Sequence, residues 1–230
     1  MKFGYKTGIK GLNAILPESV NRGDKMKLIL ASSSPRRIEL LRKLGLEFEV
    51  MPPIWETKII SDDPVEVAEY IALEKARAVA GFLTEGIVIG ADTIVYVDGR
   101  MLGKPKDVEE AKMFLRMLSG KVHDVITGIA LINAANNREI VDHEITKVKF
   151  RELSDEEINW YVSTGEPLDK AGAYAIQGLG CLFIEKIEGD FFNVVGLPLA
   201  KLYVMLKQMG YDILRKIKRR KHILFLRNFF

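Results

Sequence analysis

The chain has 230 residues, of which 48% are hydrophobic and 28% charged, as in a globular protein of one large domain or two small ones. Its one cysteine, Cys181, excludes an intrachain disulfide and favours a reducing, cytoplasmic setting. No run of about eighteen apolar residues predicts a membrane span, and no signal peptide is recognisable, so attachment to a membrane is not expected.

The net charge of +3 is unevenly distributed along the chain. Residues 1–25 carry five Lys/Arg and two Asp/Glu, and residues 215–230 carry seven Lys/Arg and no acid, so residues 26–214 have a net charge of −7. A body of that sign is not expected to bind nucleic acid. We divide the chain into a weakly ordered N-terminal extension (1–25), one domain (26–212) and a basic, partly apolar tail (213–230).

The first predicted elements are a strand and a helix joined by three serines. Residues 28–31 form a short apolar run, and Ser34 and Pro35 suit the N-cap and first position of the helix that follows. Arg36 and Arg37 fall in its first turn, where the helix dipole disfavours cations. This is either a helix start with two solvated arginines or a site where hydroxyls, backbone N–H groups and guanidinium groups bind an anion such as phosphate.

A second helix is predicted from Asp63 to about Leu83, because an N-cap aspartate, a proline and a capping-box glutamate begin it. Lys75 falls on the apolar face of this helix, one turn from both Ile71 and Val79. A lysine in this position either extends along the helix to solvent or reaches an anion beside the core.

Residues 86–97 are apolar at nearly every position, which predicts a central strand buried on both faces of an α/β sheet. Asp92 interrupts this run, and a buried carboxylate must be paired, protonated or bound to a metal ion. It could cap a turn at a strand end, but residues 94–97 continue the strand. We therefore interpret Asp92 as a functional carboxylate.

The rest of the chain alternates between further predicted helices and strands, which indicates α/β or mixed α+β structure around one central sheet. A glycine-rich loop is predicted at 165–180, and a last helix is predicted within 193–209, starting near Pro198. The other predictions are helices at 107–119 and 154–163 and strands at 123–132, 140–150 and 181–187.

The side chains that could carry chemistry are carboxylates and cations near loops and strand ends. The sequence has no P-loop, no G-x-G-x-x-G and no zinc-type grouping of cysteine and histidine. Carboxylates can hold a hard divalent ion while lysine and arginine neutralise phosphate oxygens, so the pattern predicts a phosphate-ester or nucleotide site with Mg²⁺ as a candidate cofactor. The candidates are Glu56, Asp92, Asp169, Asp190, Arg36, Arg37, Lys75, Lys104 and Lys170.

Six short motifs occur in order: ASSSPRR at 31–37, EKA at 74–76, GADT at 90–93, GKP at 103–105, DKAGAYAIQG at 169–178 and VGLP at 195–198. Together they resemble the Maf family of nucleoside triphosphate pyrophosphatases. The resemblance implies a mixed α/β fold like that of inosine triphosphatase, with an elongated sheet, flanking helices and a cleft between two lobes. It also implies cleavage between the α- and β-phosphates with Mg²⁺ or Mn²⁺, and family members are often homodimers.

The resemblance also implies roles for individual residues. Asp92 would accept the proton of the attacking water and contact the metal ion, and Glu56 would match the second acidic metal ligand. The residues implied in phosphate binding are Ser32, Ser34, Arg37, Lys75 and Lys104.

Three positions indicate the branch of the family that acts on dTTP and UTP. Arg36, Thr93 and Gln177 match that branch, whereas the branch acting on 7-methyl-GTP departs at all three. A guanidinium and an amide can satisfy the O4, N3–H and O2 edge of uracil or thymine, so Arg36 is expected to face the base while Arg37 holds the triphosphate. The predicted products are a nucleoside monophosphate and pyrophosphate.

Two other functions are kept as alternatives. The first is a non-catalytic nucleotide-binding regulator of cell division or septum formation, which would bind nucleotide without releasing pyrophosphate. The second is a phosphomonoesterase, which would release orthophosphate.

Overall fold

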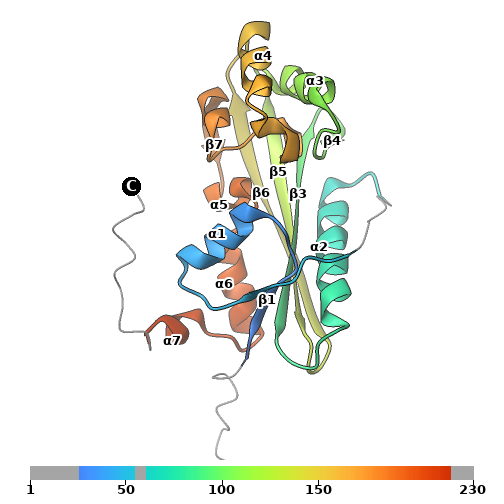
Figure 1. The fold of residues 1–230 in the computed structure, drawn as a ribbon, viewed down its shortest axis with the longest axis vertical. Helices are drawn as coiled ribbons and strands as arrows, with labels where there is room; N and C mark the ends of the chain where they lie inside the picture. The colour runs from blue at the N-terminus through green and yellow to red at the C-terminus, as the bar shows by residue number, and fades with distance from the viewer. Residues whose placement is uncertain (1–25, 55–60, 219–230) are drawn as a thin grey trace, which may run out of the picture.

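The computed structural model describes residues 26–54 and 61–218, and its centre is a mixed sheet with strand order β2-β1-β3-β5-β6-β7 (Figure 1). β1 runs parallel to β2 and β3, and the other pairs are antiparallel. This confirms the predicted mixed α/β fold with an elongated sheet. The strands are β1 (Leu28–Leu30), β2 (Glu49–Val50), β3 (Ile87–Val97), β4 (Arg100–Leu102), β5 (Val122–Asn133), β6 (Arg138–Phe150) and β7 (Ile184–Glu188).

Helices cover both faces of the sheet, and most begin where the capping residues predict. Asp63, Asp107 and Ser154 each accept a hydrogen bond from a backbone N–H of the first helical turn. The helices are α1 (Pro35–Lys43), α2 (Pro64–Ala80), α3 (Val108–Leu118), α4 (Asp155–Ser163), α5 (Phe191–Val195), α6 (Leu199–Gln208) and α7 (Ile213–Lys218).

Two parts of the prediction were wrong. The expected loop at 165–180 contains the short 3₁₀ helices η2 (Glu166–Asp169) and η3 (Ala171–Ala173), and η4 (Leu179–Phe183) extends beyond it, so β7 begins three residues later than predicted. The backbone of Gly172 has φ of 67°, which breaks any longer helix here. In addition, α5 precedes the predicted helix start at Pro198, and Gly196 with φ of 120° separates it from α6.

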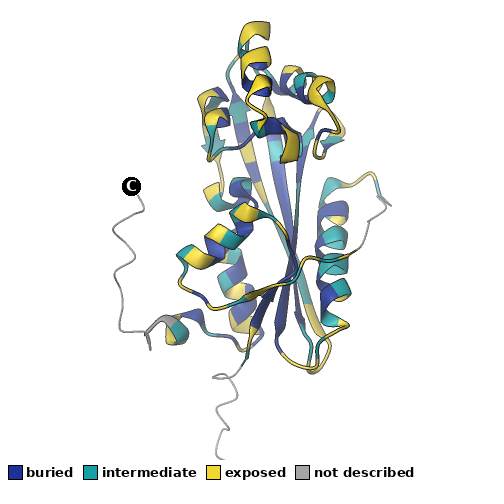
Figure 2. Ribbon diagram, in the orientation of Figure 1, coloured by how far each residue is buried: buried dark blue, intermediate teal, exposed yellow. Residues whose placement is uncertain are grey.

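Strand residues alternate between two helical layers, so β1 and β3 are buried on both faces (Figure 2). Leu28, Leu30 and Ile89 pack in the cluster that includes residues of α1 and α6, whereas Ile29 and Val88 pack in the cluster that includes residues of α2. The β3–β5–β6 strands continue beyond these helices into a second core, shared with α3 and α4. The molecule therefore has two lobes along one sheet (Figure 1).

β3 is longer than the strands that border it on one side. β1 pairs with residues 87–89 and β4 with residues 95–97, while β5 pairs with residues 87–96 on the other side. Residues 90–94 therefore have no strand partner along the β1 side among the residues that the structure describes. Because successive side chains of a strand point to opposite faces, Asp92 and Thr93 project to the two sides of this open edge.

α2 approaches the sheet closely at two glycines. A Cβ atom on Gly90 would lie 2.1 Å from the Ala72 backbone oxygen, and one on Gly128 would lie 2.3 Å from the Ala68 backbone oxygen. Only a residue without a side chain permits this spacing. The contact positions α2 directly over the part of β3 that carries Asp92.

The predicted tail begins as a helix. Ile213 of α7 is 4% exposed and packs in the main core with Tyr211. The predicted N-terminal extension and residues 219–230 lie outside the described residues. No helix within the described ranges is long and apolar enough to cross a bilayer.

His123 of β5 is a buried titratable group in the second core. It is 2% exposed, its Nε2 lies 2.8 Å from the Tyr174 hydroxyl, and within the described structure its Nδ1 has no hydrogen-bond partner. The surrounding apolar side chains disfavour the imidazolium, so burial lowers the pKa of His123 to about 3.

We expect Gly90→Ala to destabilise the protein by roughly 3 kcal/mol, because the added methyl group meets backbone atoms of α2 that cannot move alone. Urea unfolding measures the change. Gly103→Ala is the matched control, since nothing lies within 4 Å of its Cβ position. Equal midpoints for the two variants would contradict the close packing of α2.

We also expect stability to fall as the pH is lowered. The unfolded chain protonates His123 near the ordinary pKa of 6.5, whereas the folded chain does so only near 3. The contribution of neutral His123 to stability is therefore fully present above pH 6.5 and is lost as the pH falls toward 3. The free energy of unfolding should decrease by about 2 kcal/mol between pH 7 and 5. Denaturant unfolding of the wild type and of His123→Gln at both pH values measures this, and an equal loss in both proteins would refute it.

Candidate active site

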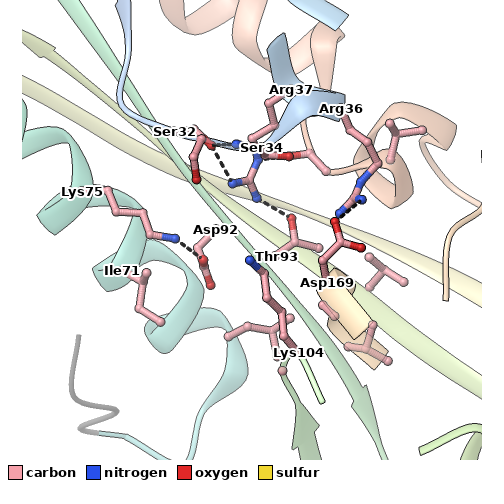
Figure 3. A pocket seen from close by; sticks show the side chains of 18 of the residues that line it. Ser32, Ser34, Arg36, Arg37, Ile71, Lys75, Asp92, Thr93, Lys104 and Asp169 are labelled. Atoms are coloured by element: carbon pink, nitrogen blue, oxygen red, sulfur yellow. Dashed lines mark hydrogen bonds and ion pairs between the residues drawn. The ribbon is translucent and has the colours of Figure 1, made fainter. Parts of the chain in front are cut away.

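A cavity of about 690 Å³ opens at the free edge of β3, in the size range of small-molecule sites. The β1–α1 turn and α2 line it from one lobe, and the segment after β4 and the region of η2 and η3 line it from the other. This confirms the predicted cleft between two lobes. The predicted site residues that line it are Ser32, Ser34, Arg36, Arg37, Lys75, Asp92, Thr93 and Lys104 (Figure 3).

Asp92 and Lys75 form an ion pair in the cavity wall. The Lys75 Nζ atom lies 2.5 Å from Asp92 Oδ1, and the two side chains are 26% and 19% exposed. Burial lowers the pKa of Lys75, and the charge of Asp92 opposes that shift. Lys75 therefore reaches the predicted carboxylate instead of extending to solvent.

Positive charge exceeds negative charge around this pair. Lys104 follows β4 and points across the cavity toward Asp92 (Figure 3). The charges of Arg37 and Lys104 both act to lower the pKa of Lys75. Three cations around one carboxylate give a cavity suited to a polyanion.

α1 begins at the cavity without a side-chain cap. Ser34 occupies the predicted N-cap position, but its side chain makes no capping hydrogen bond, and its N–H donates to Ser32 Oγ over 3.1 Å. The first turn also contains no acidic residue. The positive end of the helix dipole therefore faces the cavity, and no carboxylate in the first turn of α1 compensates it. This arrangement favours binding of an anion.

Arg37 is a buried tether between three segments of the chain. Its Nε donates to the Gly196 carbonyl over 2.7 Å, one terminal nitrogen donates to Thr93 Oγ1 over 2.9 Å, and the other lies 3.5 Å from Ser32 Oγ. Burial lowers the pKa of its guanidinium, and Asp92 opposes the shift. These contacts of Arg37 were not predicted from the sequence.

Arg36 points away from Arg37, toward the other lobe (Figure 3). Its terminal nitrogen lies 3.8 Å from Asp169 Oδ2, and Asp169 also pairs with Lys170. Burial lowers the pKa of Arg36, and the charge of Asp169 opposes that shift. Asp169, a candidate carboxylate without an assigned role, is therefore an ion-pair partner of the guanidinium that is predicted to read the base.

The structure does not bring every candidate into the cavity. Gln177 is exposed and is not part of the lining, although Ala175 and Ile176 just before it are. Asp190 accepts a hydrogen bond from the Phe192 N–H as the N-cap of α5, which is a structural role. Glu56, the predicted second metal ligand, lies outside the described residues.

Asp92 fits a divalent metal ion, because Mg²⁺ is usually bound by one or two carboxylates together with substrate phosphates. A different group of possible ligands, formed by Glu69, Asp142 and His143, also occurs within residues 26–54 and 61–218. It is not part of the cavity lining, and Lys201 Nζ lies 2.9 Å from Asp142 Oδ1. A lysine therefore already supplies positive charge there.

Two examples represent the solved structures that are similar to part of this chain. They are a nucleoside-triphosphatase/dITP/XTP pyrophosphatase from Mycobacterium abscessus (20% identity, TM-score 0.39, covering 56% of this chain and 76% of that one) and the Ham1 protein of Staphylococcus aureus (16%, 0.41, 64% and 85%).

Residues 27–209 match the family described as Maf-like protein. Three relatives named dTTP/UTP pyrophosphatase come from Carboxydothermus hydrogenoformans (51% identical, covering 81% of this chain and 100% of the relative), Symbiobacterium thermophilum (54%, 81% and 96%) and Alkaliphilus oremlandii (56%, 81% and 97%). With a family match over most of its length and relatives of this similarity, the chain belongs to the Maf family.

Proposed function

We propose that this protein hydrolyses dTTP and UTP to the nucleoside monophosphate and pyrophosphate. The observation that carries the proposal is the position of Asp92, paired with Lys75 at 2.5 Å in a cavity that Arg37 and Lys104 also line. The names of the relatives support the same activity and the same substrates.

The triphosphate would lie at the cationic end of the cavity. The charges of Lys75 and Lys104, together with the N-terminus of α1, neutralise its oxygens and hold the α-phosphorus near Asp92. Arg37 contributes its charge from a fixed position, since its contacts hold it against β3. Ser32 and Ser34 supply hydroxyls to the same wall.

Hydrolysis requires a water molecule activated beside the α-phosphorus. One oxygen of Asp92 is bound by Lys75, and the other can accept the proton of the attacking water. The P–O bond to the β-phosphate then breaks and pyrophosphate leaves, with its charge neutralised by the lysines.

A divalent cation, Mg²⁺ or Mn²⁺, would be held by Asp92 together with phosphate oxygens of the substrate. When bound, it would polarise the phosphoryl group and neutralise its charge. Glu56 would be the second ligand according to the family pattern.

The base would lie toward the second lobe. Arg36, held by Asp169, would donate to an exocyclic oxygen of uracil or thymine, and Thr93 would contact the same edge. We assign Gln177 to this group because of the family pattern and its position next to Ile176, which lines the cavity.

We further propose that the enzyme acts in the cytoplasm as a homodimer. The single, exposed Cys181 suits a reducing compartment, and family members are often dimers. Light scattering of the purified protein tests the dimer.

We expect a panel of nucleotides incubated with Mg²⁺ or Mn²⁺ to give UMP or TMP and pyrophosphate. Asp92→Asn should lower kcat at least about 100-fold, because the amide cannot accept the proton of the water. Chromatography identifies the products. Asp98→Asn, at an exposed turn outside the cavity lining, is the matched control.

Three results would contradict the proposed function. Undiminished turnover by Asp92→Asn would exclude Asp92 as the base. Orthophosphate as the product would indicate a phosphomonoesterase, and tight binding without hydrolysis would indicate a regulator.

Substitution of the two neighbouring arginines should have different effects on substrate selectivity and on stability. Arg36→Ala should reduce the preference for UTP over other nucleotides roughly tenfold, because one hydrogen bond to the base is lost. Arg37→Ala should weaken the binding of all substrates alike and lower the melting temperature, because two buried contacts and one partly buried contact lose their donor. Steady-state kinetics and thermal unfolding measure both effects, and an equal loss of selectivity would refute the division.

A further inference from the structure

We infer that Thr127, a fully buried residue of β5, fixes the hydroxyl of Thr93 as a hydrogen-bond acceptor toward the cavity, and that this polarity selects uracil and thymine over cytosine. The inference rests on the proposed function and assigns a residue that controls its base selectivity without touching the substrate.

The direction of the hydrogen bonds follows from counting protons. The Thr127 hydroxyl lies 3.2 Å from the backbone carbonyl oxygen of Asn193, which can only accept, so Thr127 donates its single proton there. Thr127 Oγ1 also lies 2.9 Å from Thr93 Oγ1. Because the proton of Thr127 is already used, Thr93 must be the donor in this second bond.

After these contacts, the Thr93 hydroxyl can make one further hydrogen bond, and only as an acceptor. Arg37 donates to Thr93 Oγ1 over 2.9 Å, which occupies one of its two lone pairs. The side chain is partly exposed and lines the cavity. A ligand that meets this hydroxyl therefore has to supply the proton.

The surrounding contacts favour this direction of the hydrogen bonds. Thr127 and Asn193 are both 0% exposed, and Thr127 is the direct cross-strand partner of Thr93. The Asn193 side chain is itself held, because its Nδ2 donates to the Val125 carbonyl and to Thr146 Oγ1, each over 2.9 Å. If Thr127 turned its proton toward Thr93, the buried backbone carbonyl of Asn193 would lose this donor and keep only the Gly196 N–H, which donates to it over 2.9 Å.

A donor and an acceptor that line the same cavity can distinguish the pyrimidines. The Arg36 guanidinium can only donate, and Thr93 can only accept. Uracil and thymine offer the complementary pair, an O4 acceptor beside an N3–H donor. Cytosine offers the reverse, an amino donor at C4 beside an N3 acceptor, and so is mismatched at both positions.

The experiment compares selectivity in Thr127→Val and Thr127→Ser. The ratio of kcat/KM for UTP and CTP is measured, together with the ratio of Kd for their non-hydrolysable α,β-methylene analogues. Thr127→Val should lower both ratios roughly tenfold, because Thr93 loses its acceptor partner and can turn its proton toward N3 of cytosine. Thr127→Ser restores the hydroxyl and should retain the wild-type ratios.

Thr146→Val is the matched control. It makes the same change in the same buried polar cluster, but Thr146 contacts Asn193 and Asp190 and makes no hydrogen bond to Thr93. A loss of selectivity caused only by loosening of the core would occur in this control as well.

Unchanged ratios in Thr127→Val would overturn the inference and would mean that Thr93 meets another donor, such as a ribose hydroxyl.

If Thr127→Val does not fold, Thr93→Val and Thr93→Ser provide the same comparison, and equal ratios in those two variants would overturn the inference. Equal affinity of the unmodified protein for the two analogues would also overturn it. A preference for the UTP analogue without release of pyrophosphate from UTP would contradict the proposed function alone.

Discussion

The interrupted pairing of β3 is the constraint on which the site depends. Asp92 and Thr93 are neighbours in a strand, so their side chains point to opposite faces of the sheet. In a continuous sheet the layer of strands would separate them. Because β1 ends at Leu30 and β4 begins to pair only at Val95, both side chains reach one cavity around an open edge. The carboxylate faces α2, and the hydroxyl faces α1 and α5.

The same arrangement places three cations, Arg37, Lys75 and Lys104, around the single carboxylate of Asp92. Arg37 and Lys75 are largely removed from solvent, and burial lowers the pKa of both. Like charges held in a partly desolvated cavity repel each other, which destabilises the empty protein. An anionic ligand removes that repulsion, so occupancy of the site and stability of the fold are linked. The close packing of α2 at Gly90 maintains this arrangement, since it fixes Lys75 against Asp92.

The sequence was sufficient to predict β3 and α2, and to predict that Asp92 is paired, protonated or bound to a metal ion, because an isolated carboxylate within a buried strand is costly. Which of the three applies, and that Lys75 is the partner, came from the structure. Thr127 could not be identified in the same way, since a threonine in an apolar strand is an ordinary β-sheet residue. Its role depends on contacts with residues 34 and 66 positions away along the chain. The three 3₁₀ helices were missed for a related reason: glycines that suggest a loop also permit short, tightly packed turns. The tether formed by Arg37 likewise depends on Gly196, which is 159 residues away.

The chain of hydrogen bonds from Thr93 through Thr127 ends at the backbone carbonyl of Asn193, and this end group limits how base selectivity can vary. A chain that ended in another hydroxyl could reverse as a unit and present either polarity to a ligand. The backbone carbonyl of Asn193 has no proton to give, so Thr127 can hydrogen-bond to it only as the donor, which leaves Thr93 as the donor to Thr127. Arginine remains charged under physiological conditions, so the donor on the other side of Thr93 is equally fixed. None of these groups changes protonation near neutral pH. Base selection should therefore be independent of pH in that range, even where the rate of hydrolysis is not.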